Sequence, residues 1–179
     1  KLYKRKNWLI IMENVGKVPN TLNCIWTLWA HLPHDTSWGL PSYKKIMTFG
    51  SVEEAIVLTE SIPHKMVRNC MLFIMREGIT PMWEDPRNKD GGSFSYKVSN
   101  KIVPIAWRDL TYKLVGESMI VDPSVQNAIN GITISPKKNF CVIKIWMANC
   151  NTQDATIIGD SVQGIASQGC LFKKHNPEY

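Results

Sequence analysis

Two of the seven tryptophans in this 179-residue chain lie in segments that are typical of loops. Trp38 belongs to the segment DTSWGLP, and Trp83 belongs to GITPMWEDP. The glycine, proline and aspartate residues around both indoles favour turns over regular structure. Because a loop tip leaves an indole face free, we interpret Trp38 and Trp83 as a surface on which flat rings stack.

Three further tryptophans are better explained by packing. Trp26 and Trp107 stand among aliphatic residues in segments with a regular apolar pattern, and we predict that both are buried in the core. Trp29, at the end of the same segment as Trp26, is also predicted to be a core residue.

No arrangement typical of an enzyme, a metal site or a cofactor site accompanies these residues. The chain has no nucleophile elbow, no phosphate-binding P-loop and no paired-cysteine zinc motif. The acidic pairs at 53–54 and 84–85 are not spaced to hold the metal of a hydrolase. His31 and His34 flank Pro33 in an expected loop, so we predict a surface pair rather than metal ligands.

Charge and composition limit the class of protein. The net charge of +6 favours a polyanionic partner, either nucleic acid or anionic lipid, and a 44% hydrophobic content supports one compact domain. We expect a basic, flexible segment at 1–20 and a single domain at 21–179. The longest apolar runs, 8–12 and 71–75, are too short for a membrane span, which predicts a soluble cytoplasmic protein. The five cysteines, odd in number, are expected to be reduced core thiols.

The elements that position the loops can be predicted from periodicity. Ser51 and Glu54 fit the capping-box pattern, so a helix should begin there and end before Pro63. Apolar residues three and four apart predict two more helices, at 104–114 and 152–162. Short segments rich in β-branched and aromatic residues predict strands. The fold class is α+β, a mainly antiparallel sheet with about three helices on one face. The predicted strands span residues 22–29, 44–49, 71–76, 92–98, 131–134 and 140–147.

The sequence around Trp83 resembles a known family. GITPMWED at 78–85, followed by NKDGG at 88–92, is similar to the central signature of translation initiation factor 4E, the family that binds the messenger RNA cap. WTLW, SW, FGSVE, LVGE and IKIW follow in the family's order, so the resemblance runs over about 22–159. It implies a divergent member with the family fold, a curved sheet with helices on its convex face and the cap on the concave side. With 20 residues left after Gly159, 168–175 is expected to supply one last strand.

The resemblance implies binding of 7-methylguanosine and no enzymatic activity. Trp38 and Trp83 match the two indoles that sandwich the methylated base, whose positive charge adds cation–π attraction to stacking, about 1–3 kcal/mol per ring. Glu84 matches the acid that accepts hydrogen bonds from guanine N1 and N2, a pair that adenine and pyrimidines lack. Trp146 matches the indole that borders the methyl group.

The cap phosphates are expected to contact Lys137 and Lys138, in the loop before the last long strand. Lys137 falls where the family has an arginine, and lysine lacks the guanidinium fork, which predicts lower or more salt-sensitive phosphate affinity. Two other basic positions of the family fall on Asn139 and Ser93. Candidate substitutes, each more simply explained as a solvated surface residue, are Lys144, Lys173 and Lys174.

The family's dorsal surface binds a scaffold initiation factor or repressor peptides, and the chain departs from it. Val52 and Gly116 match that surface, whereas Ile56 replaces a tryptophan and Arg108 replaces a leucine. Losing an indole and an aliphatic anchor removes a central part of the interface, so ordinary scaffold peptides are expected to bind weakly.

Several alternatives stay open at this point. A monomer that binds the cap could recruit messenger RNA to translation, or sequester it as a repressor when no scaffold binds. A general single-stranded RNA-binding module would use the same aromatic and basic residues without preferring the methylated cap. An interaction module could keep the fold and lose the ligand.

Overall fold

The computed structural model describes residues 18–175. Residues 18–20 are exposed and have no regular structure. The rest of the expected N-terminal segment 1–20 and the last four residues lie outside the described part of the chain.

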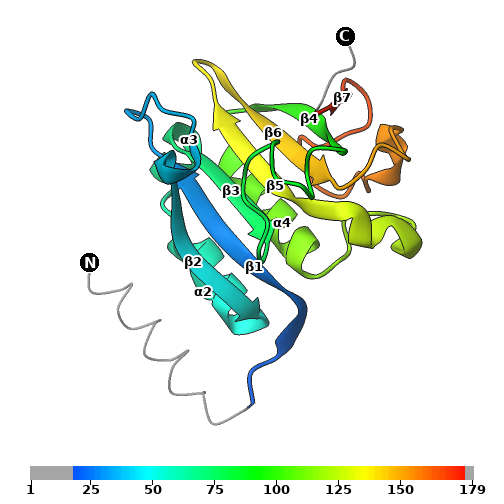
Figure 1. Cartoon of the computed structure of the whole chain (residues 1–179), viewed down its shortest axis with the longest axis horizontal. Coiled ribbons are helices and arrows are strands. Elements are labelled where there is room, and N and C mark those ends of the chain that lie inside the picture. Colours follow the sequence, from blue (N-terminus) through cyan, green and yellow to red (C-terminus); the bar gives the residue numbers. More distant parts are fainter. Residues whose placement is uncertain (1–17, 176–179) are drawn as a thin grey trace.

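The described chain is built on one curved, seven-stranded antiparallel sheet (Figure 1). Its strand order is β2-β1-β3-β5-β6-β4-β7, so β2 and β7 are the edges. All six predicted long strands are confirmed, most of them extended by a few residues, and the expected last strand is present as a short β7. The strands are β1 (Thr21–His31), β2 (Tyr43–Ser51), β3 (Met71–Arg76), β4 (Gly92–Ser99), β5 (Ile129–Pro136), β6 (Phe140–Met147) and β7 (Leu171–Lys174).

Three α-helices cover one face of this sheet (Figure 1). They are α2 (Val52–Ser61), α3 (His64–Asn69) and α4 (Val103–Val115). The predicted capping box is confirmed, since the Ser51 hydroxyl accepts a hydrogen bond from Glu54 N and the Glu54 carboxylate accepts one from Ser51 N. The helix expected at 104–114 is α4, and α3 was not predicted.

The prediction of a helix at 152–162 is wrong. The structure has only a 3₁₀ turn there, Ala155–Ile157, whose first turn is capped by the Asp154 carboxylate. Ile158 instead forms an isolated bridge with Ile120, and the apolar residues at this spacing still face the core. Consecutive β-branched residues and a following glycine disfavour the α conformation, so the segment packs its apolar side chains without forming a helix.

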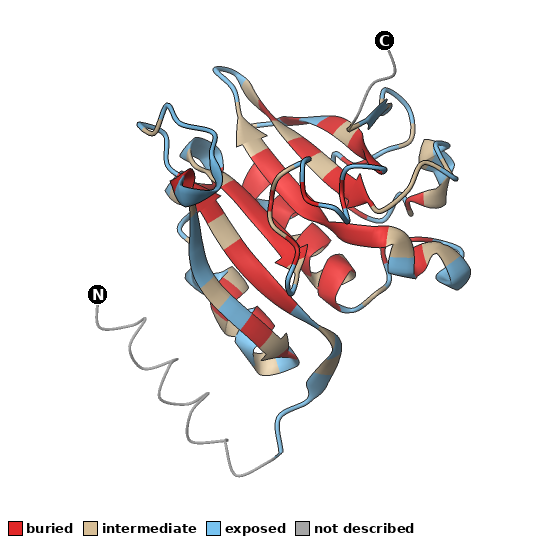
Figure 2. Ribbon diagram, viewed as in Figure 1, coloured by how far each residue is buried: buried red, intermediate tan, exposed pale blue. Residues whose placement is uncertain are grey.

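The main core lies between the helices and the sheet (Figure 2). Trp26 and Trp107 are buried in it, as predicted. Trp29 lies on the other sheet face and is only partly buried, because alternation along β1 turns it away from Trp26. All five cysteines are free, but only Cys141 is fully buried, so the expectation of core thiols holds fully for that residue alone.

A second, smaller apolar cluster lies on the concave face, opposite the helices. Its buried members are Phe73, Met75, Ile79 and Trp146. Phe73 and Met75 alternate along β3 with Leu72 and Ile74, which belong to the main core. The loop between β3 and β4 contributes Ile79, so this cluster attaches the loop to the sheet. No helix of the described residues is long and apolar enough to cross a membrane.

Candidate functional site

Trp38 lies in the connection between β1 and β2 and is 59% exposed. One face of its indole is covered by the imidazole of His31, with ring centroids 4.3 Å apart and an interplanar angle of 9°. His31 Nε2 donates to the carbonyl oxygen of Ser37 at 2.8 Å, which also fixes the tautomer. Because the ring behind it is held in place, Trp38 presents its other face for stacking.

The prediction of a surface histidine pair is wrong for His31. Its side chain is buried, because the last residue of β1 faces the concave side, where Tyr43 packs edge-on against the imidazole at 5.3 Å. His34 is exposed in the loop, as expected. No local sequence pattern indicates that His31 supports an indole seven positions later.

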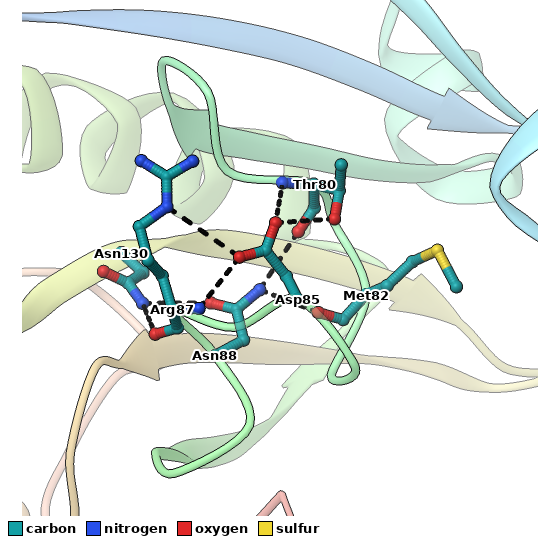
Figure 3. Close-up of polar contacts among 6 residues, drawn as sticks. All are labelled: Thr80, Met82, Asp85, Arg87, Asn88 and Asn130. Carbon is teal, nitrogen blue, oxygen red and sulfur yellow. Dashed lines mark hydrogen bonds and ion pairs between the residues drawn. The ribbon is translucent and has the colours of Figure 1, made fainter.

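Trp83 is 51% exposed and lies in the loop between β3 and β4. Asp85 organises this loop from a buried position (Figure 3). Its Oδ2 accepts hydrogen bonds from Thr80 N at 2.8 Å and Thr80 Oγ1 at 2.7 Å, and its Oδ1 accepts one from Arg87 N at 2.9 Å. Burial raises the pKa of Asp85, but these hydrogen bonds outweigh it and hold the pKa below its usual value. Asp85 is therefore the charged centre of an ordered loop.

Two buried asparagines complete this polar network (Figure 3). The Asn88 amide donates to the carbonyl oxygens of Thr80 at 3.0 Å and Met82 at 2.8 Å. The amide of Asn130, on β5, donates to Arg87 O at 2.7 Å and to Asn88 Oδ1 at 2.9 Å. Satisfied buried polar groups of this kind specify one backbone conformation. None of these three positioning residues was predicted from the sequence, although Asp85 and Asn88 lie inside the motif.

Glu84 follows Trp83 and is exposed. Its negative charge contributes, after burial, to the raised pKa of Tyr43. Tyr43 packs on His31, and His31 stacks on Trp38, so the charge of Glu84 acts on a tyrosine in the aromatic group that supports Trp38. Two ordered loops thus each expose an indole, and the loop of Trp83 also exposes the Glu84 carboxylate directly after it.

Trp146 forms part of the floor of the concave face and is only 6% exposed. Its Nε1 donates to Thr133 Oγ1, on β5, at 2.7 Å, which satisfies the buried indole. The ring of His175 lies against it at 4.6 Å and an interplanar angle of 50°.

The two predicted phosphate ligands, Lys137 and Lys138, are both exposed at the turn between β5 and β6. This turn is closed by a hydrogen bond from Lys137 N to Phe140 O at 2.8 Å. Lys144, on β6, is partly buried on the concave face. Burial, followed by the positive charges of Lys173 and Lys137, lowers the pKa of Lys144.

On the helical side, the predicted partner surface divides into two grooves. Val52 and Ile56 are exposed and line an apolar groove of about 380 Å³, together with Tyr112, which was not predicted from the sequence. Arg108 lies in a neighbouring groove and forms an ion pair with Asp109 at 3.0 Å. Gly116 is the C-terminal cap of α4 and lines neither groove.

The described residues contain no group of three or more His, Cys, Asp or Glu side chains that could hold a metal ion.

The family model, the sequence relatives and the solved structures that match this chain all name initiation factor 4E. Residues 21–178 match the family model described as eukaryotic initiation factor 4E. Translation initiation factor 4E of Candida albicans is 29% identical over 154 residues, which cover 80% of this chain and 72% of that protein. Isoform 4E of Nicotiana tabacum is 30% identical over 148 residues, with 79% and 72% covered.

Two solved structures are similar in fold. Ascaris suum eIF4E-3, in complex with an m7G cap, has a TM-score of 0.67 and 22% identity, with 75% of this chain and 77% of that chain covered. Caenorhabditis elegans eIF4E-3, in complex with the 4E-binding protein Mextli and a cap analogue, has a TM-score of 0.67 and 23% identity, with 74% and 76% covered. The fold, the sequence motif around Trp83 and the family match agree: the chain belongs to the eukaryotic initiation factor 4E family.

Proposed function

We propose that this chain binds the 7-methylguanosine cap of messenger RNA and acts in translation initiation. The observation that carries the proposal is the pair of exposed indoles, Trp38 and Trp83, held in ordered loops beside Glu84. The cap complex of the Ascaris suum relative supports it. As a member of a family of initiation factors, the chain is not an enzyme.

The base would stack between the free face of Trp38 and the indole of Trp83. N7-methylation gives guanine a delocalised positive charge, which each indole face attracts. Glu84 would accept hydrogen bonds from N1 and N2, which gives selectivity for guanine. Trp146 would border the methyl group from the floor of the site, and Lys137 and Lys138 would contact phosphates.

The dorsal groove around Val52 and Ile56 is the proposed surface for a scaffold factor or a repressor peptide. The Mextli complex of the worm relative supports a binding-protein partner. Ile56 presents less apolar area than an indole, and Arg108 places a charge, paired with Asp109, at the next groove along α4. These two residues favour a second candidate role, a cap-sequestering repressor with weak scaffold binding.

In this role residues 21–179 form a single cap-binding domain that acts as a monomer, and the protein is cytoplasmic because its ligand, messenger RNA, is translated there. A general single-stranded RNA-binding module is the competing model, and it predicts no preference for N7-methylation.

Titration with 7-methyl-GTP and with GTP, followed by tryptophan fluorescence, tests the proposal. The wild type should bind the methylated nucleotide at least about tenfold more tightly than GTP, and Trp83→Ala and Glu84→Ala should each lose binding of the methylated nucleotide. Asp90→Ala, an exposed carboxylate of the same loop, is the matched control and should bind as the wild type. Equal binding of both nucleotides by the wild type would refute cap recognition.

A further inference from the structure

The apolar groove on the helical side is built from three segments of the chain. Its described lining residues are Val52, Ala55 and Ile56 on α2, Tyr112 and Val115 on α4, and Leu22 near the start of β1. None of these residues is charged, and Val52 and Ile56 expose 39% and 41% of their surface. Apolar side chains left in water favour an apolar occupant of the groove.

The chain enters the fold at one end of this groove. Val52 N donates to Asn20 O at 2.9 Å, and the side-chain amide of Asn20 donates to Glu53 Oε1 at 2.7 Å. Both hydrogen bonds attach the residue before β1 to the first turn of α2. Leu22, two positions later, lines the groove itself. The residues that precede Asn20 therefore start directly beside the groove.

The segment 1–17, which lies outside the described residues, has a sequence suited to such a groove. Four of its apolar residues recur at helical spacing, namely Trp8, Ile11, Met12 and Val15. Apolar residues three, four and seven positions apart form the face with which an amphipathic helix binds a groove. Residues 16–21 can span up to about 20 Å, which is enough for the chain to reverse direction before β1.

Charge favours the same pairing. Residues 1–17 contain five basic residues and one acidic residue, whereas α2 has three glutamates and neither lysine nor arginine. Glu60, in the last turn of α2, accepts a hydrogen bond from Tyr112 Oη at 3.1 Å, which puts a carboxylate at the end of the groove away from Asn20. A helix over 8–15 and the length of α2 up to Glu60 are both about 11–12 Å. A helix laid antiparallel to α2 would therefore bring the basic residues at 4–6 to Glu60.

We propose that residues 8–15 bind in this groove of the same chain, as a helix antiparallel to α2. The cis contact goes beyond the proposed function, because a scaffold factor or repressor could reach the groove only by displacing the chain's own segment. A linker of this length gives an effective concentration of about 1 mM. A segment that binds in trans with a Kd of about 100 µM would then cover the groove about nine-tenths of the time.

Calorimetric titration of the full chain with a synthetic peptide of residues 1–17 tests the cis contact. In the wild type the peptide must compete with the chain's own segment. Trp8→Asp places a charge on the apolar face of that segment and should free the groove, so this variant should bind the peptide about tenfold more tightly than the wild type. Asn14→Asp adds the same charge to the same segment away from that face and should bind the peptide as the wild type does.

Two further substitutions in the Trp8→Asp chain identify the groove. Ile56→Lys removes an apolar contact and repels the basic peptide, so it should abolish peptide binding. Ile105→Lys makes the same change in the neighbouring groove, at a residue that is also 41% exposed, and should leave peptide binding intact. Thermal melts check that the variants fold, and Val52→Lys repeats the test in the same groove.

Other occupants of the groove give other results. Equal peptide affinity in the wild type and Trp8→Asp, or no binding to either, would overturn the cis contact and leave the groove to a separate partner. A wild-type dimer in sedimentation that Trp8→Asp loses would mean that the segment binds a second copy, which also overturns it. Loss of peptide binding in Ile105→Lys and not in Ile56→Lys would overturn the assignment to this groove. Because the groove lies on the helical side of the sheet, a wild type that does not distinguish 7-methyl-GTP from GTP would refute cap recognition and leave the peptide result unaffected.

Discussion

Replacing Asp85 by alanine should uncouple the Trp83 loop from the rest of the site. The substitution removes three hydrogen bonds to a buried carboxylate and leaves Thr80 N without its acceptor. A hydrogen bond to a charged group contributes at least about 1.5 kcal/mol, so the three together contribute at least about 4.5 kcal/mol, part of which is recovered because water replaces them when the loop opens. We expect about 2–3 kcal/mol to be lost from 7-methyl-GTP binding, which raises Kd about 30-fold to 150-fold.

The assay is the same fluorescence titration, combined with urea unfolding to separate loop order from global stability. Asp90→Ala is the control, because it removes an exposed carboxylate of the same loop. Asp85→Asn should be intermediate, since both carboxylate oxygens accept and an amide supplies only one acceptor. The wild-type Kd in Asp85→Ala would refute the claim that this network orders the loop.

The pH dependence of the same variant has a definite sign. The folded-state pKa of Asp85 lies below its unfolded value near 3.8. The carboxylate therefore stabilises the fold fully above that value, and its contribution is lost as the pH falls through the folded pKa. The difference in unfolding free energy between wild type and Asp85→Ala should be constant from about pH 5 to 8 and should shrink below about pH 4.

Two other predictions concern the concave face of the sheet and the helical side. His31→Ala should leave one face of the Trp38 indole unsupported and weaken 7-methyl-GTP binding about threefold to tenfold, because one aromatic stacking contact is lost. His31→Phe should restore most of that affinity. Equal Kd values for wild type and His31→Ala in the fluorescence titration would contradict this role. The double substitution Ile56→Trp and Arg108→Leu should strengthen the binding of a scaffold-derived helical peptide at least about tenfold, as measured by calorimetry. The affinity for 7-methyl-GTP should stay unchanged. Unaltered peptide affinity would mean that these two residues do not limit peptide binding at the dorsal surface.

Local signals in the sequence predicted the sheet and two of its helices. The capping box at Ser51 is a contact between residues three apart, so it can be read without the fold. The exposure of Trp38 and Trp83 also followed from local turn residues. The prediction of a helix at 152–162 was wrong because a segment of turns can bury apolar residues at the same spacing. Here Ile158 forms an isolated bridge with Ile120 instead.

The missed parts of the site depend on contacts between distant segments. His31 is a support for Trp38 only because β1 ends facing the concave side, where Tyr43 of β2 packs beside it. The grouping of Lys144 with Lys173 requires β7 to pair with β4, a register that periodicity does not specify. Asn130 acts on the loop from β5, more than 40 residues away. Such contacts are set by tertiary packing.

The two edges of the sheet have a further consequence for how the protein behaves at high concentration. Each edge strand carries two adjacent lysines, Lys44 and Lys45 on β2 and Lys173 and Lys174 on β7, and β7 is only four residues long. An edge strand exposes backbone groups on which another chain can add a strand. Pairing of any two of these edges would bring lysines of like charge together in a chain that already carries a net charge of +6. The same residues that favour polyanions thus work against strand-by-strand aggregation.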